Sequence, residues 1–421
     1  MIFAYIVFCF VAMGVGFIYY RKIYNPISLY TAVWVLAVGL YSGNLIEFYD
    51  LSYFSWIVIF FGHLLFVCGC LLGVYVKPVH SMSIEHDDCL LKKNIFLGIL
   101  VTLLLSSVAI VGNVKTMMSI YGVNLYENVI QIYADRVNES QKIETIPYLS
   151  SFIFISLPLL GVYTKKYGFN LIVIPSFILV CLNSLVSGGR AGIVFSLLLF
   201  SSAYICTKGG NTGFSLGKKL AVLIGIILFS LMIAGVSEQR TAGVSIRYVT
   251  PLYMSIFGDN VALYKAIAYV AAPIGTLNEY LKSCDFHFGE NTFLTIYNIL
   301  AKFGLCERIN QYQEFFLTPI PCNVGTWIRE IVEDFTVVGA IFFIPFFGFM
   351  ASLLYCCAEK YPLISYKVIW SVCSLIILLS FFDWRLRTSN MWIALLFGYL
   401  IGCYIDRKSV DYTRNMGKRD G

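Results

Sequence analysis

The sequence changes character at Trp327-Ile328-Arg329-Glu330-Ile331-Val332-Glu333-Asp334, which closes a polar segment and runs directly into an apolar one. The polar segment covers residues 237–335 and opens on Ser237-Glu238-Gln239-Arg240. It is the only long segment of the chain that is not made of long apolar runs. Its arginines, carboxylates and aromatic residues are gathered between apolar segments. We therefore expect the function to reside in this stretch and the rest of the chain to position it.

The composition identifies the class of protein. Of the 421 residues, 59% are hydrophobic and only 13% are charged, which is more apolar surface than a soluble fold needs. Apolar blocks alternate with short charged ones, a pattern typical of membrane-spanning helices and not of a β-barrel. The expected fold class is therefore all-α, a polytopic integral membrane protein. The net charge of +6 lies mostly in short loops, so no nucleic-acid partner is expected.

The apolar runs predict the number of spans. A helix needs about 20 predominantly apolar residues to cross the hydrocarbon core, and on that rule the chain has about eleven spans. They run over residues 1–20, 26–46, 54–76, 95–113, 148–164, 168–186, 190–207, 220–236, 336–358, 363–382 and 389–405. The predicted organisation has four parts: spans one to eight in 1–236, a large outer loop in 237–335, spans nine to eleven in 336–405, and a tail in 406–421.

Lysine and arginine predict the orientation. Every second loop is basic, as cytoplasmic loops are. The residues in this set include Arg21, Lys22, Lys92, Lys93, Lys165, Lys166, Lys218, Lys219, Lys360, Arg407 and Lys408. The opposite loops begin with the acidic Glu47-Phe48-Tyr49-Asp50. The N-terminus and the segment 237–335 are therefore expected outside, and the C-terminal tail is expected in the cytoplasm, where its basic residues suit anionic lipid headgroups.

Both large outer segments are expected to contain helices. In residues 113–147, apolar residues recur at helical spacing around Ile130 and Tyr133, which predicts an amphipathic surface helix. This helix could take part in substrate binding, or it could only connect the neighbouring spans; both interpretations stay open. In the large loop, a first helix is predicted over Asp259–Val270, broken by Pro273 and Gly275. A second is predicted over Thr292–Lys302, capped by Asn291 and ended by Gly304. A third is predicted to start at Thr326 and to continue unbroken into the ninth span.

Arg190 is the first candidate anion-binding residue. It follows Ser187-Gly188-Gly189 and precedes an apolar helix. A charged group in a membrane helix costs about 2.5–3.5 kcal/mol at the helix centre and is usually functional. The glycines allow a tight turn whose amides, with the guanidinium, form an anion site. The alternative is an arginine that only reaches the headgroup region.

Two further arginines follow the eighth span. Arg240 and Arg247 would lie on one helix face, about 10 Å apart along its axis. Guanidinium groups bind phosphate oxygens in a bidentate manner, so the pair suits a diphosphate. Anchoring to lipid headgroups is the alternative.

The densest charge cluster lies at the end of the large loop. Arg329 and Glu333 are neighbours at i,i+4 on one helix, as are Glu330 and Asp334. Close carboxylates raise each other's pKa, which makes one of them a candidate base. The alternative is a surface network of ion pairs.

Other polar residues could contribute to the site. His287, with Glu290 three residues on, is a weaker candidate base, and Asp383, Arg385 and Arg387 after the tenth span could complete a charged outer rim. Cys284, Cys306 and Cys322 in the loop allow either one disulfide or three free thiols. The sequence contains no metal-binding spacing and no nucleotide-binding motif, so neither a metal nor a cofactor is expected.

Taken together, the spans, the Ser187-Gly188-Gly189-Arg190 turn and a large outer loop that opens on Arg240 and Arg247 resemble the bacterial Wzy family. These are the oligosaccharide repeat-unit polymerases, also called O-antigen polymerases. The helix from Gly325-Thr326-Trp327 through Glu333-Asp334-Phe335 to Gly339 is also similar to what that family shows. The resemblance covers the architecture of the whole chain.

The resemblance implies a GT-C-like fold and glycosyl transfer on the periplasmic face of the bacterial inner membrane. Donor and acceptor would both be undecaprenyl-diphosphate-linked glycans, with a chain-length regulator and a flippase as further partners. Arg190, Arg240, Arg247 and Arg329 would bind the diphosphate, and Glu330, Glu333, Asp334 or Glu238 would activate the acceptor hydroxyl. A lipid-linked oligosaccharide flippase, an O-antigen ligase using His287, and a structural membrane protein are the alternatives. The sugars joined and the polysaccharide class are not specified by the sequence.

Overall fold

The computed structural model describes residues 1–76, 86–125, 127–137, 146, 148–187, 191–209, 246–310 and 313–410. These residues form a nearly all-α protein with one two-stranded antiparallel ribbon, β1 (Phe316–Leu317) and β2 (Pro321–Cys322). The chain divides into two compact units that each combine separate parts of the sequence. The first unit takes 1–77, 243–356 and 376–389, and the second takes 78–242, 357–375 and 390–421.

The described residues have the helices of a membrane protein. Five helices are long and apolar enough to cross a membrane: α1 (Ile2–Tyr20), α3 (Tyr53–Tyr75), α4 (Asp88–Tyr121), α13 (Trp327–Lys360) and α15 (Ser389–Lys408). Four shorter apolar helices are α2 (Pro26–Ser42), α7 (Val173–Ser187), α8 (Ala191–Cys206) and α14 (Ile364–Leu378). Ten of the eleven predicted spans overlap a helix, and the eighth, 220–236, lies outside the described residues.

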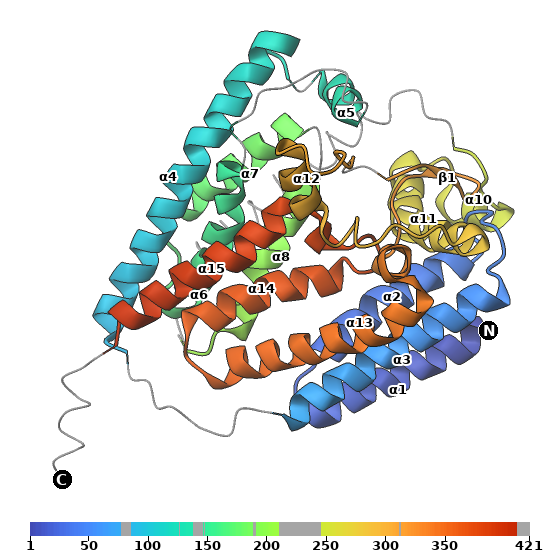
Figure 1. Cartoon of the computed structure of the whole chain (residues 1–421), viewed down its shortest axis with the longest axis horizontal. Coiled ribbons are helices and arrows are strands. Elements are labelled where there is room, and N and C mark those ends of the chain that lie inside the picture. The colour runs from blue at the N-terminus through green and yellow to red at the C-terminus, as the bar shows by residue number, and fades with distance from the viewer. Residues whose placement is uncertain are drawn as a thin grey trace. The chain divides into compact units, whose positions relative to one another are not determined.

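In the first unit, α1, α2 and α3 pack together, and α13 lies along α3 (Figure 1). Small residues allow the close approach of α3 and α13, as in many membrane helix pairs. A Cβ added to Gly69 would lie only 2.0 Å from the carbonyl oxygen of Pro345. Between the helices lies an aromatic core that includes Tyr30, Phe66 and Trp327.

The part of this unit that precedes α13 contains α10 (Pro251–Phe257), α11 (Val261–Ser283) and α12 (Leu294–Lys302). The predicted break at Pro273 and Gly275 is wrong, because α11 continues through both residues. Residues around this point are buried, and Gly275 packs closely against Thr318 of the β-ribbon turn. Tertiary packing here outweighs the low helix propensity of proline and glycine.

Two further details of the loop differ from the prediction. Helix α12 begins at Leu294 instead of Thr292, and its N-cap is Phe293, not Asn291. The predicted end is confirmed, since Gly304 follows the helix with a φ of 71°. The helix predicted to run unbroken from Thr326 is interrupted, because Thr336 in α13 has φ 62° and ψ 174°.

The second unit contains α4, α5 (Val129–Val137), the 3-10 turn η1 (Leu149–Phe152), α6 (Ile153–Tyr167), α7 and α8, with parts of α14 and α15. Helix α6 packs between α4 and α8, and a Cβ on Gly161 would lie 2.4 Å from the Phe200 carbonyl oxygen. The predicted amphipathic helix around Ile130 is confirmed as α5.

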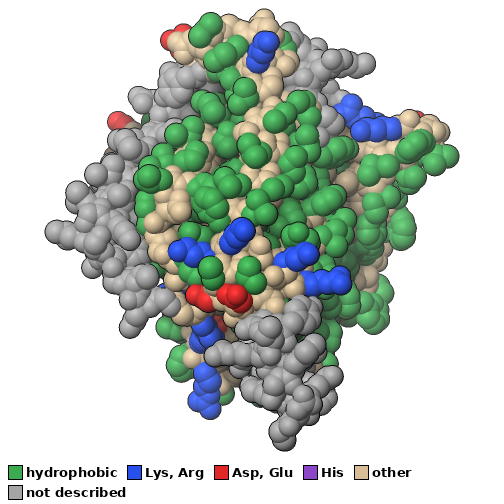
Figure 2. All heavy atoms as spheres, turned by 90° about the vertical axis from the view of Figure 1, so that its left-hand side faces the viewer, with side chains coloured by type: hydrophobic (Ala, Val, Ile, Leu, Met, Phe, Trp, Pro, Cys, Tyr) green, Lys and Arg blue, Asp and Glu red, His purple; other side chains and the backbone are tan. Residues whose placement is uncertain are grey.

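The face formed by α4 is apolar over most of its area, and basic side chains gather along one edge (Figure 2). Exposed apolar residues on α4 include Leu97, Val101, Leu104, Val108 and Val111. The exposed basic residues Lys92, Lys93, Arg407 and Lys408 belong to the end of the unit where α4 begins and α15 ends. An apolar band bounded by lysine and arginine is what a lipid-facing surface requires.

Candidate functional site

The candidate site is built around the first turns of α13, in the first unit. Thr326 caps the helix, since its hydroxyl accepts a hydrogen bond of 3.2 Å from the backbone N–H of Arg329. The backbone N–H of Trp327 donates to the carbonyl of Ser380, and its buried ring donates through Nε1 to the Tyr30 hydroxyl at 3.0 Å. These bonds fix the start of the helix against α2 and against the segment that follows α14.

Arg329 is almost fully buried, with 2% of its surface exposed. Its guanidinium carbon lies 4.6 Å from the centre of the Phe316 ring and 5.6 Å from that of Tyr280, within the range of cation–π contacts. Nη1 donates to Oε1 of Gln313 at 3.3 Å, and Nε lies 3.8 Å from Oε2 of Glu333. The predicted i,i+4 pairing of Arg329 with Glu333 is confirmed.

Gly325 makes room for this arginine. A Cβ at position 325 would lie 2.5 Å from Cδ of Arg329. The backbone N–H of Gly325 also donates to Oε1 of Gln313 at 3.1 Å, so one amide oxygen holds both the loop and the arginine. The side chain of Arg329 is therefore fixed from two directions.

Glu330 is fully buried, with no exposed surface. Its Oε1 accepts a hydrogen bond of 3.4 Å from Nη1 of Arg387, which lies on the 3-10 turn η2 (Arg385–Arg387). Arg387 is itself 7% exposed. The arginine supplies the opposite charge that a carboxylate needs when it is removed from water.

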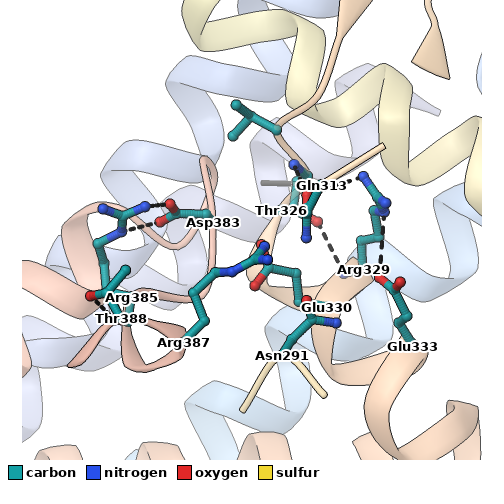
Figure 3. Close-up of polar contacts among 12 residues, drawn as sticks. Asn291, Gln313, Thr326, Arg329, Glu330, Glu333, Asp383, Arg385, Arg387 and Thr388 are labelled. Atoms are coloured by element: carbon teal, nitrogen blue, oxygen red, sulfur yellow. Dashed lines mark hydrogen bonds and ion pairs between the residues drawn. The ribbon is translucent and has the colours of Figure 1, made fainter. Parts of the chain in front are cut away.

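A second pair lies beside the first on the same turn. The guanidinium of Arg385 donates to the carboxylate of Asp383 and forms an ion pair with it. Burial lowers the pKa of Arg385 to about 10, against the opposing effect of Glu330, so the side chain remains a cation at neutral pH. Together, η2 and the start of α13 bring three arginines and three carboxylates into one small region (Figure 3).

Asp334 has a different environment from Glu330. Its Oδ1 accepts hydrogen bonds from the backbone N–H and the side-chain amide of Asn291, and its Oδ2 accepts one from the backbone N–H of Thr292 at 2.6 Å. This carboxylate fastens the start of the α12 region to α13. The prediction that Asp334 takes part in catalysis is not tested by these contacts, but its oxygens already have partners.

The interruption at Thr336 adds to this attachment. A regular α-helix would use the carbonyls of Glu333 and Asp334 for bonds to residues four positions on. Here they accept from the backbone N–H groups of His287 at 2.9 Å and Gly289 at 3.2 Å. The loop around His287 is thus hydrogen-bonded directly to the helix that carries the candidate site.

The cluster contains several buried polar atoms without a hydrogen-bond partner among the described residues. They are Gln313 Nε2, Arg329 Nε, Glu330 Oε2, Glu333 Oε2 and Arg387 Nε. Figure 3 shows their side chains lying around the start of α13. Buried polar atoms are nearly always paired, so a group of unpaired ones in one place calls for an explanation.

The other predicted diphosphate-binding residues are Arg190, Arg240 and Arg247. Arg190 and Arg240 lie outside the described residues. Arg247 is exposed and lies beside Tyr264, next to the segment that pairs with the end of α2. The predicted grouping of these arginines therefore stays a prediction.

Several details of the site were absent from the sequence prediction. Sequence reasoning placed Arg387 on an outer rim, but not against Glu330, and it missed Gln313. The only signal for Arg387 was its place in a short polar break between two apolar segments. His287 is exposed, and its Nδ1 lies 3.6 Å from Oε2 of Glu290.

The cysteines of the loop and the described acidic residues were also candidates for a disulfide or a metal site. Cys284, Cys306 and Cys322 are free thiols. Within the described ranges, no group of three or more His, Cys, Asp or Glu side chains could hold a metal ion.

No protein-family model, curated protein or solved structure matches this chain. The chemistry of the site must therefore be argued from its own residues.

Proposed function

We propose that this chain is a glycosyltransferase of the bacterial inner membrane, which polymerises undecaprenyl-diphosphate-linked oligosaccharide repeat units into O-antigen or a related surface polysaccharide. One observation carries the proposal: Glu330 is fully buried, pairs with Arg387 through Oε1, and has no hydrogen-bond partner for Oε2 among the described residues. A buried carboxylate with an unpaired oxygen costs free energy, and such residues in membrane proteins are usually functional. A base that receives a proton from a hydroxyl fits this description.

In the proposed step, the hydroxyl oxygen of the acceptor glycan attacks the anomeric carbon of the donor glycan and gives its proton to Glu330 Oε2. The new glycosidic C–O bond forms as the bond from the anomeric carbon to the diphosphate oxygen breaks. Undecaprenyl diphosphate leaves with the electron pair, so the activated donor supplies the driving force. General-base assistance of this kind contributes about 10²–10⁴-fold to the rate.

The leaving diphosphate needs cations to stabilise its charge. Arg190, Arg240 and Arg247 keep this role in the proposal, with the site on the periplasmic face and a chain-length regulator and a flippase as partners. Arg329 is a weaker candidate for the diphosphate, because Glu333 and Gln313 already contact its guanidinium. Stabilising charge that develops on the leaving group is a major source of catalysis in such reactions.

Glu330→Gln tests the proposal, because it keeps the shape of the side chain and removes the base. In a strain that lacks the chromosomal copy, surface polysaccharide is separated on a gel after expression of each variant has been verified. We expect lipid A core bearing a single repeat unit, while Lys282→Ala, an exposed residue of the same unit, keeps the full ladder. A full ladder with Glu330→Gln would reject the assignment of Glu330.

O-antigen ligase remains a second candidate, because the backbone N–H of His287 is bonded to the carbonyl of Glu333 beside the cluster. A ligase would transfer the glycan to lipid A core, with His287 as the base. The same gel separates the two functions. Loss of a ligase or a flippase leaves core alone, and this result with His287→Ala would favour the ligase.

A further inference from the structure

The buried cluster offers donors and acceptors in the same small space. Gln313 Nε2 and Arg387 Nε are donors without partners among the described residues, and Glu330 Oε2 is an acceptor in the same position. All three side chains lie around the first turn of α13 (Figure 3). A ligand that satisfies this set must both donate and accept hydrogen bonds.

The charges of the cluster exclude a strongly anionic ligand. Each arginine has a carboxylate: Arg329 has Glu333, Arg387 has Glu330, and Arg385 has Asp383. A diphosphate placed here would bring its negative charges against Glu330 and Glu333, and like charges at close range are unfavourable. It can also only accept hydrogen bonds from the protein when it is ionised. A neutral, polar ligand fits the balance of charge better.

The ion pairs around Glu330 and Arg329 are longer than charge-assisted hydrogen bonds usually are. Arg387 Nη1 lies 3.4 Å from Glu330 Oε1, and Arg329 Nε lies 3.8 Å from Glu333 Oε2. Charge-assisted hydrogen bonds between N–H and a carboxylate are usually about 2.7–2.9 Å long. A hydroxyl that approaches such a pair from the side can donate to the carboxylate and accept from the guanidinium, so both charges gain a shorter contact.

We propose that the Gln313, Arg329, Glu330, Glu333 and Arg387 side chains form a saccharide subsite that binds the acceptor glycan through its hydroxyl groups. The lipid-linked diphosphates are held elsewhere. A sugar hydroxyl is both donor and acceptor, as the cluster requires. The attacking hydroxyl donates to Glu330 Oε2, and a neighbouring hydroxyl accepts from Gln313 Nε2. This inference rests on the proposed function, since it names the substrate part that the same site holds.

Gln313→Glu is the most direct test. It removes the Nε2 donor but retains oxygens that can accept from Gly325 and Arg329. The full chain is placed in lipid nanodiscs, and its binding is measured to two probes. One is bare undecaprenyl diphosphate, and the other is undecaprenyl diphosphate carrying the repeat unit isolated from the source cells.

The wild-type chain and the Lys282→Ala control should bind the glycosylated lipid more tightly than the bare lipid. Gln313→Glu and Glu333→Gln should weaken binding of the glycosylated lipid by about tenfold, which corresponds to about 1.4 kcal/mol, and leave the bare lipid unchanged. Thermal unfolding of each variant shows whether it is folded, and the binding ratio of the two lipids corrects for any inactive fraction.

Three results would overturn the subsite. Equal weakening for both lipids would assign the cluster to the diphosphate. Unchanged binding of both would mean that solvent alone satisfies the buried atoms, and a wild-type chain without preference for the glycosylated lipid would remove the basis of the inference. The proposed function fails separately: a chain that prefers the glycosylated lipid but forms no polymer would keep the subsite and reject the polymerase.

Discussion

Arg387 Nη1 lies 3.4 Å from Glu330 Oε1, although 57 residues separate the two along the chain. Glu330 lies in the first turns of α13, and Arg387 lies on the turn between α14 and α15. The ion pair therefore connects the start of α13 to the turn that precedes α15. Both side chains are buried, so each depends on the other for its opposite charge.

Arg387→Met should strongly destabilise the first unit. The substitution introduces an apolar side chain of similar length and leaves Glu330 buried without an opposite charge. Breaking a buried pair in this way costs about 3–5 kcal/mol. The measurement is the midpoint of thermal unfolding of the purified chain in a single detergent.

The double variant Glu330→Leu with Arg387→Met is the matched control. Replacing both members of a buried pair by apolar groups is often neutral or stabilising, by about 1–4 kcal/mol. We expect it to recover most of the lost stability while remaining without polymerase activity. A double variant as unstable as Arg387→Met would show that the pair contributes more than mutual neutralisation.

Asp334→Asn should loosen the loop without removing the proposed base. The substitution replaces one acceptor oxygen by a donor that faces the N–H groups of Asn291 or Thr292. Hydrogen bonds to a charged group contribute about 1.5–3 kcal/mol each. Limited proteolysis should cut residues 287–292 faster than in the wild type. Asp285→Asn, an exposed carboxylate of the same loop, should leave the rate of cleavage unchanged.

Thr336→Gly should stabilise the protein. At φ 62° and ψ 174°, Thr336 occupies a region that only glycine adopts readily, at a cost of about 1–3 kcal/mol for other residues. The flexibility of glycine in the unfolded chain removes about 0.5–1 kcal/mol of that gain. Thr336→Ala keeps the unfavourable backbone conformation and should not raise the unfolding midpoint. If both variants lower it equally, the conformation at position 336 is not under strain.

Gly69→Ala should separate α3 from α13. The added methyl group would lie 2.0 Å from the backbone oxygen of Pro345, which cannot rotate away as a side chain can. Overpacking of this kind costs about 1–3 kcal/mol. Gly14→Ala, in α1 of the same unit, has no atom within 4 Å of the new methyl group and should not lower the unfolding midpoint. The comparison uses the unfolding midpoints of the two variants.

The sequence predicted the helical membrane class and most of the helices, because long apolar runs leave few other structures available. The positions of α1 to α3 and of α13 to α15 follow from this rule within a few residues, whereas α4 (Asp88–Tyr121) extends well beyond its predicted span of 95–113 at both ends. Where packing decides the structure, the prediction failed. Pro273 and Gly275 read as a break, yet α11 passes through both because its buried face packs against neighbouring elements.

The site was predictable only where its contacts are local. Arg329 and Glu333 pair because they are four residues apart on one helix. Glu330 and Asp334 have the same spacing, but one pairs with Arg387 and the other with the backbone before α12. Both partners are distant in the sequence, so helical spacing carried no information about them. The conformation of Thr336, which also decides what Asp334 and Glu333 contact, has no sequence signal of its own.

The interruption of α13 at Thr336 has a mechanical consequence. The turns before Thr336 are hydrogen-bonded to α2, to the Ser380 segment and to the His287 loop, whereas the residues after it form the apolar, membrane-spanning part of α13. Spanning helices tilt to match bilayers of different thickness. The interruption at position 336 allows the spanning part of α13 to tilt while Glu330 keeps its position. The rate of the proposed reaction should therefore vary little between thin and thick lipid bilayers.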